Sequence, residues 1–189
     1  MERKYVIGLD YGTLSGRAII ADCKDGTVLA SAVKEYDHGG MSEYLPDGTE
    51  LTGTGWALQN PKDYIDVLKY IIPEAVAQSG VSSKDIIGIG LDFTSCTMLP
   101  VDENNVPLCL LVKNVSRPHA WVKLWKHHGA QKQADEINEL LKKRGEIDNI
   151  QFGGKISSEL LLPKILQIVE EDPELYDEAA SFLEVGDWL

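Results

Sequence analysis

The sequence is poor in cysteine, in positive charge and in long apolar runs. Its 189 residues include three cysteines without CxxC spacing, which excludes a disulfide framework and predicts reduced, buried thiols. Lysine and arginine number 18 against 30 aspartates and glutamates, a net charge of −12. Nucleic acids and anionic membranes are bound through basic residues, so neither partner is expected. No apolar run reaches the roughly 20 residues of a membrane helix. Met1 leads almost directly into a strand rather than a signal-peptide core, so we expect a cytoplasmic protein.

The remaining composition, 43% hydrophobic and 25% charged, is that of a globular protein that can bury a core. Without repeats or a clear linker, it predicts one domain over residues 1–189. Apolar periodicity predicts an antiparallel meander, a long loop, a crossover helix that begins at Asn60, and a strand buried on both faces. The meander occupies residues 6–36, the loop 37–59, the helix 61–78 after its cap at Asn60, and the buried strand 86–92. Strands over 98–101 and 107–112 follow, then helices over 133–144, from Ser157 or Ser158 to about 171, and over 173–179, and a strand from 182.

The turn after the first strand carries the groups that a phosphate site needs. Asp10 ends the strand, and a carboxylate there can hold Mg²⁺ or its water shell. Gly12 lets the backbone approach a ligand and adopt positive φ. Thr13, Ser15 and the exposed N–H groups can donate to phosphate oxygens, and Arg17 adds a fork-shaped donor. The alternative is an ordinary hairpin with turn residues at its tip.

Two later segments carry candidate sugar contacts. Thr94 and Ser95 follow the strand over 86–92, and ligands of α/β sheets lie beyond the carboxyl ends of strands. Trp121 and Trp125 are four residues apart, which predicts one helical face. An indole can stack against sugar C–H groups, although for one of the two the alternative is helix packing. The pair His127 and His128 does not favour a metal site, because adjacent helical residues point about 100° apart.

The run Asp10-Tyr11-Gly12-Thr13, with Ser15 and Arg17, resembles the first phosphate loop of the sugar-kinase, heat-shock ATPase and actin superfamily. Together with three further segments, it makes the whole chain similar to the amino-terminal domain of the FGGY family of carbohydrate kinases. These segments are 88–100, 119–128 and 153–159. The fold implied is an α/β, ribonuclease-H-like domain with a mixed sheet and crossover helices.

The resemblance implies ATP and Mg as cofactors, and a role for each candidate residue. Asp10 would serve Mg²⁺ through water, while Gly12, Thr13, Ser15 and Arg17 face the phosphates. The sugar contacts implied are Thr94, Ser95, Trp125, Trp121, Phe152 and Lys155. The Asp-Phe-Thr and Trp-Val-Lys-Leu-Trp-Lys-His-His segments are most similar to those of family members that phosphorylate L-ribulose to L-ribulose 5-phosphate, a step in L-arabinose catabolism.

In this family a second domain supplies the adenosine pocket, a further phosphate loop and an aspartate general base. No residue here matches that base, so no catalytic residue is assigned, and we expect the 189 residues to be an amino-terminal part that is inactive alone. The expected partners are a sugar, ATP and the missing carboxy-terminal domain, and a homo-oligomer is compatible with the sequence. Two alternatives stay open, a kinase for another ketopentose or polyol and a non-catalytic sugar-binding or assembly module.

Overall fold

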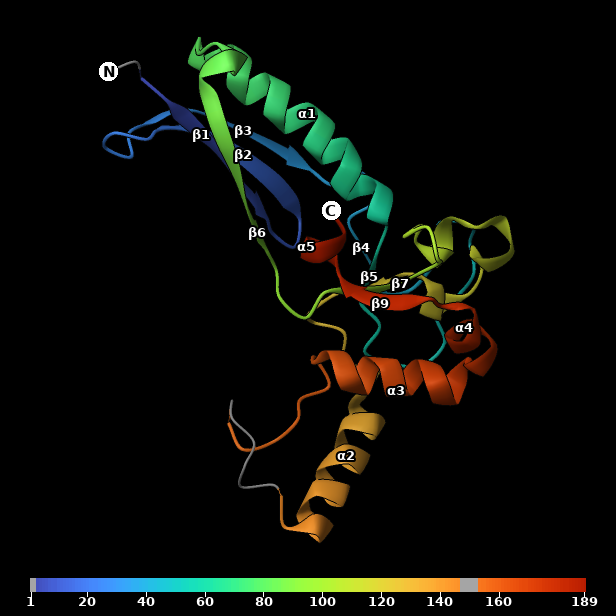
Figure 1. Cartoon of the computed structure of the whole chain (residues 1–189). Coiled ribbons are helices and arrows are strands. Elements are labelled where there is room, and N and C mark those ends of the chain that lie inside the picture. The colour runs from blue at the N-terminus through green and yellow to red at the C-terminus, as the bar shows by residue number, and fades with distance from the viewer. Residues whose placement is uncertain (1–2, 147–152) are drawn as a thin grey trace. The chain divides into compact units, whose positions relative to one another are not determined.

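The computed structural model describes residues 3–146 and 153–189 and divides into two compact units (Figure 1). Unit 1 comprises Met1–Gly39, Asn60–Thr94 and Leu189, and unit 2 comprises Gly40–Gln59 and Ser95–Trp188. Each unit therefore combines segments that are distant in sequence. Among the described residues, no helix is both long and apolar enough to cross a membrane.

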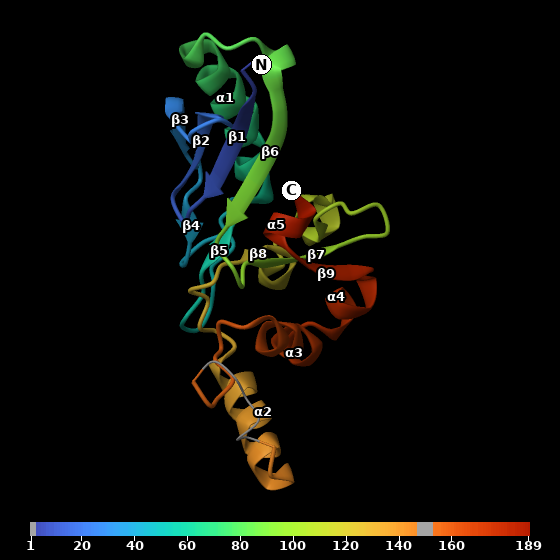
Figure 2. The same cartoon turned by 60° about the vertical axis from the view of Figure 1, so that its left-hand side comes forward.

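Unit 1 is a four-stranded mixed sheet with one long helix, α1, packed on it (Figure 2). The strand order is β3-β2-β1-β6. The elements are β1 (Tyr5–Tyr11), β2 (Ser15–Asp22), β3 (Val28–Glu35), α1 (Pro61–Ser79), the 3-10 turn η1 (Ser83–Asp85) and β6 (Ile86–Phe93). Strands β1, β2 and β3 pair antiparallel, whereas β6 runs parallel to β1. The predicted meander and crossover helix are confirmed.

Local sequence signals set both ends of α1. The Asn60 side chain accepts a hydrogen bond from the Lys62 N–H, and Pro61 occupies the first turn, where its missing N–H costs nothing. Gly80 ends the helix with φ of 66°, a left-handed conformation that glycine adopts without strain. The prediction of this helix from its caps is confirmed.

Removing this cap should weaken unit 1 measurably. Asn60→Ala is expected to lower the free energy of unfolding by about 1 kcal/mol, because the Lys62 N–H loses its acceptor. Asn60→Ser, which restores a capping oxygen, should recover most of the loss. Urea unfolding followed by circular dichroism measures both variants. Equal stability of Asn60→Ala and the parent chain would show that the cap contributes nothing.

One face of the sheet is buried by α1 and the other is open. Alternate residues of β1 are buried, among them Ile7 and Leu9, and so are Val67 and Ile71 of α1. The prediction that β6 is buried on both faces is wrong. Ile87, Ile89 and Leu91 of β6 are 63%, 62% and 42% exposed. The physical reason is position, since β6 is the outer strand of the described sheet and α1 packs over β2 and β3.

Unit 2 is an antiparallel sheet of short strands with helices around it. The strand order is β4-β5-β8-β7-β9. The strands are β4 (Gly40–Met41), β5 (Leu58–Gln59), β7 (Met98–Val101), β8 (Val122–Lys123) and β9 (Ser181–Glu184). The helices are α2 (Gln131–Arg144), α3 (Leu161–Glu171), α4 (Pro173–Glu178) and α5 (Val185–Trp188). The 3-10 turns are η2 (Leu108–Leu110), η3 (Val112–Asn114) and η4 (Pro118–Ala120). The apolar core gathers Leu58, Met98, Leu108, Ala120, Trp121, Ile168 and Leu175.

Several local predictions for unit 2 are wrong. The expected strand over 107–112 consists of 3-10 turns, in which Leu110 N–H donates to Pro107 O and the bonds close locally instead of along a ladder. The expected helical face of Trp121 and Trp125 does not exist, because β8 lies between them. The N-cap of α3 is Leu160 rather than either of the predicted serines.

Two smaller predictions also need correction. The loop over 37–59 contains the two-residue strands β4 and β5, which pair with one another. Their composition is that of a loop, and only pairing with distant partners makes them strands. The cysteines were expected to be buried, yet Cys23 is exposed and Cys96 is partly exposed, while Cys109 is buried.

Candidate functional site

The predicted phosphate loop connects β1 and β2 and is held by the end of β3. Gly12 N–H donates to Ser15 O at 3.0 Å, and the Tyr36 hydroxyl donates to Gly12 O at 2.8 Å. Gly12 is not in the left-handed region, contrary to the expectation, and a Cβ there would meet Ser15 O at an ordinary 3.5 Å. The turn geometry therefore does not demand glycine at this position, which leaves close approach of a ligand as the role expected for it.

An aromatic cluster supports this loop from the α1 side of the sheet. Tyr11 stacks on Phe93 with ring centroids 5.4 Å apart, and Tyr64 meets both rings and Tyr36 edge to face. The Tyr11 hydroxyl donates to Tyr64 O at 3.1 Å. Burial raises the pKa of Tyr11, Tyr36 and Tyr64, so all three hydroxyls stay protonated. Sequence reasoning missed this cluster, whose members come from β1, α1, β6 and the residue that follows β3.

Three charged residues form a row across the open face of the sheet. Arg17 is opposite Asp10 in the antiparallel register, and Asp92 is opposite Asp10 in the parallel register, so all three side chains leave the same face. Arg17 Nη1 lies 3.0 Å from Asp10 Oδ2. Asp92 was not among the predicted site residues. The signal that could have found it is its place at the end of a strand parallel to β1.

This row has the chemistry of a magnesium and phosphate site. Mg²⁺ is bound in proteins by one or two carboxylates together with phosphate oxygens and water. Asp10 and Asp92 supply carboxylates on neighbouring strands, and the partly exposed guanidinium of Arg17 supplies a fork of donors for phosphate. The residues present therefore fit a magnesium–nucleotide phosphate group.

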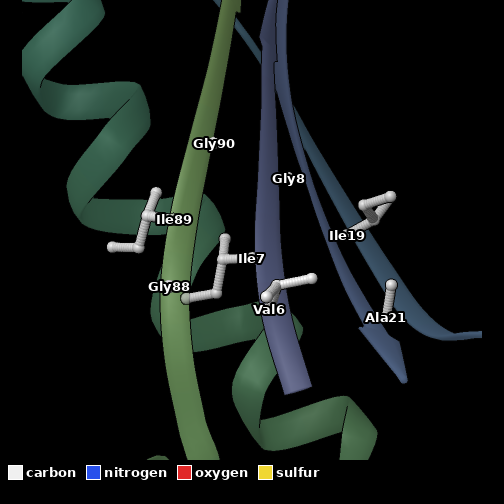
Figure 3. A pocket seen from close by; sticks show the side chains of 8 residues that line it. All are labelled: Val6, Ile7, Gly8, Ile19, Ala21, Gly88, Ile89 and Gly90. Atoms are coloured by element: carbon white, nitrogen blue, oxygen red, sulfur yellow. The ribbon is translucent and has the colours of Figure 1, made fainter. Parts of the chain in front are cut away.

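The same open face also carries an apolar depression of about 370 Å³ (Figure 3). Its lining residues are Val6, Ile7, Gly8, Ile19, Ala21, Gly88, Ile89 and Gly90. The three glycines project no side chain and so leave room beside the apolar residues. None of the lining side chains can form a hydrogen bond, so this depression does not have the chemistry of a sugar site.

The predicted sugar contacts are divided between the units. Thr94 ends unit 1, where its N–H donates to Tyr11 O at 3.2 Å. Ser95, Trp125 and Lys155 belong to unit 2 and are exposed, Trp125 by 39%. Phe152 lies outside the described residues.

Trp121 has a different environment from Trp125. It is 5% exposed within the apolar core of unit 2, and its indole N–H donates to Val115 O at 3.0 Å. Packing accounts for this side chain, which was one of the two interpretations of the tryptophan pair. Trp125, in contrast, is 39% exposed.

A buried polar network lies beneath the segment that carries the tryptophans. Lys123 is fully buried, with its ammonium 3.0 Å from His119 Nδ1 and 4.7 Å from the centre of the Trp56 ring. Burial lowers the pKa of Lys123 to about 7 and keeps His119 neutral by lowering its pKa far below the usual value. His127 Nδ1 accepts the Ala57 N–H at 3.3 Å. Of the two adjacent histidines, His127 is therefore an interior residue of unit 2, whereas His128 is exposed.

The mixed sheet, with a meander, a helical crossover and a strand parallel to β1, has the predicted α/β, ribonuclease-H-like fold. The chain is similar to the solved xyloylose kinase from Brucella ovis (TM-score 0.73, 18% identity, 97% of this chain and 33% of that one). It is also similar to the Plasmodium falciparum glycerol kinase with ADP (TM-score 0.70, 14% identity, 98% and 33%). The predicted fold class is confirmed.

Residues 5–189 match the N-terminal domain of the FGGY family of carbohydrate kinases. The chain belongs to this family. It is 51% identical over 189 residues to a protein named ribulokinase from Halalkalibacterium halodurans, covering 100% of this chain and 34% of that protein. The ribulokinase from Mycolicibacterium smegmatis is 50% identical over 187 residues, covering 98% and 33%. The chain thus spans about a third of the length of these relatives.

Proposed function

We propose that the protein containing this chain transfers a phosphoryl group from ATP to L-ribulose, giving L-ribulose 5-phosphate. The observation that carries the proposal is identity of about one half, over the whole chain, to proteins named ribulokinase. The charged row of unit 1 supports it independently, because Asp10, Arg17 and Asp92 have the chemistry that a magnesium nucleotide requires.

In the proposed reaction, unit 1 binds and orients the phosphates. Asp10 holds Mg²⁺ through water, with Asp92 as the neighbouring carboxylate. Arg17 and the hydroxyls of Thr13 and Ser15 donate to phosphate oxygens, and Gly12 gives the nucleotide room to approach. When bound, the metal offsets the negative charge of the phosphates. The Tyr36 hydroxyl fixes Gly12 O, so the loop keeps its shape.

The sugar is proposed to contact Thr94, Ser95 and Trp125, with Phe152 and Lys155 as further contacts. An exposed indole face suits the C–H groups of a pentose, and hydroxyls suit its oxygens. We assign the general base and the adenosine pocket to the additional length that the relatives have, since the chain covers 34% of the first relative.

The test is magnesium-dependent ADP formation by the polypeptide that carries this chain together with the region following it in its relatives. The panel contains L-ribulose, other ketopentoses, polyols and glycerol. We expect the highest kcat/KM with L-ribulose and none without magnesium. A higher value with another sugar would replace L-ribulose by that sugar. Absence of turnover with every sugar, from a folded protein, would favour a binding module.

A further inference from the structure

Helix α3 buries a polar stripe rather than a purely apolar one. The periodicity of the sequence favours inward positions for Leu160, Leu161, Ile165, Leu166 and Val169. In the structure, however, Lys164 and Gln167 are 0% and 2% exposed, whereas Val169 is 37% exposed. Burying an ammonium group is unfavourable unless the protein supplies hydrogen-bond acceptors for it. The stripe therefore needs an explanation beyond apolar packing.

Each polar residue of this stripe contacts the segment that carries Trp125. Lys164 Nζ donates to Leu124 O at 2.8 Å, directly before that tryptophan. One turn further along α3, Gln167 contacts His127 Nε2 at 3.0 Å and donates to Gly129 O at 3.2 Å. Helix α3 thus fixes both the backbone and a side chain of this segment.

Lys164 also reaches a second segment, the one that begins with Ser95. Its ammonium donates to Cys96 O at 2.5 Å. Cys96 has φ of 60°, a left-handed conformation that is unfavourable for a residue with a Cβ. The next residue is also held, because Thr97 N–H donates to Glu184 Oε2 at 3.0 Å. The strained turn is thus held at a carbonyl by a cation and at an N–H by a carboxylate.

We propose that Lys164 is a positioning residue for the sugar site, whose buried ammonium fixes the backbone at Cys96 and Leu124 and so places Ser95 and Trp125 relative to each other. This inference rests on the proposed function. Burial lowers the pKa of Lys164 to about 8, so the group is still mostly charged at neutral pH. No contact of Lys164 with the substrate is required.

The experiment replaces Lys164 in the enzyme used for the sugar panel. Lys164→Met keeps the length and apolar stem but removes the donors, and is expected to raise KM for the preferred sugar about 30-fold, the worth of charged hydrogen bonds. KM for magnesium-ATP should stay within about twofold of the parent value, since the residues proposed to bind the phosphates belong to unit 1, whereas Lys164 belongs to unit 2. Lys164→Gln, a milder change, should raise the sugar KM less. Lys143→Met, an exposed lysine of α2, is the matched control.

A second readout does not depend on turnover. In a Cys23→Ser background the exposed thiol of this chain is gone and Cys109 is buried, so the labelling rate of Cys96 can be followed by peptide mapping after reaction with a thiol reagent. Lys164→Met should speed labelling of Cys96 about tenfold as the turn loosens. Adding Cys96→Gly, which adopts positive φ without strain, should recover part of the sugar KM.

The outcomes separate this proposal from the function on which it rests. Unchanged sugar KM and unchanged labelling in folded Lys164→Met and Lys164→Gln would overturn the positioning role while L-ribulose turnover stands. Faster labelling in an enzyme that turns over no sugar would refute the function and leave Lys164 as a clamp of this turn alone. Equal increases in KM for sugar and nucleotide would also overturn the proposal, because they indicate general loosening.

Discussion

Asp10→Asn is expected to lower magnesium-dependent turnover of L-ribulose at least about a hundredfold, because the neutral amide lacks the negative charge with which a carboxylate attracts Mg²⁺ and its water shell. The measurement is kcat at saturating sugar over a range of magnesium concentrations. The loss should be in catalysis rather than folding. The Asp10–Arg17 pair is partly exposed, and exposed pairs contribute at most about 1 kcal/mol.

The matched control is Asp66→Asn, an exposed carboxylate on α1. It removes the same charge from the same unit and should leave kcat unchanged. Asp92→Asn is informative as well, since a reduced magnesium affinity would place the second carboxylate of the row in the site. Turnover of Asp10→Asn within threefold of the parent enzyme would remove Asp10 from the proposed magnesium role.

Gly55→Ala is expected to lower the free energy of unfolding of unit 2 by about 3 kcal/mol. Gly55 has φ of 82°, and a Cβ there would lie 2.8 Å from both Gly129 N and His128 C, which are backbone atoms that cannot rotate away. Gly55 O also accepts the N–H groups of His128 and Gly129 at 2.8 and 3.0 Å. Relieving the clash would therefore disturb these bonds.

Gly53→Ala provides the comparison, because Gly53 has φ of 94° but a Cβ would meet only Trp56 Nε1, at 3.9 Å. It should cost about 1 kcal/mol, the strain of a left-handed alanine without a clash. Tryptophan fluorescence during urea unfolding suits both variants, since Trp56, Trp121, Trp125 and Trp188 all belong to unit 2. Equal losses would mean that the segment at 128–129 moves aside freely.

Local sequence signals were sufficient to predict the strands of the meander and helix α1 of unit 1, because these elements are long and capping or turn residues mark their ends. Asn60, Pro61 and Gly80 delimit α1, and alternating apolar residues mark the strands of the meander. The burial of β6 could not be inferred, because a near-continuous apolar run carries no information about which strands or helices cover it.

Unit 2 was less predictable because distant pairing decides its structure. Two-residue strands such as β5 and β8 have no periodicity of their own, and they exist because they pair with each other. The buried Lys164 and Lys123 resemble surface lysines in sequence, and only their acceptors, 40 and 68 residues away for Lys164, reveal their roles. For the candidate site, the phosphate-loop pattern identified Asp10 and Arg17, whereas Asp92 needed the register of β6.

The interleaving of the two units has a kinetic consequence. The backbone passes between them after Gly39, Gln59 and Thr94, and again before Leu189. During synthesis, unit 1 cannot complete its sheet until β6 has been made, and β7 must await β9, more than 80 residues later. Pairings this distant fold slowly. A protease cut after Gly39, Gln59 or Thr94 leaves two fragments whose strands pair in one sheet, so nicked protein should remain associated until it is denatured.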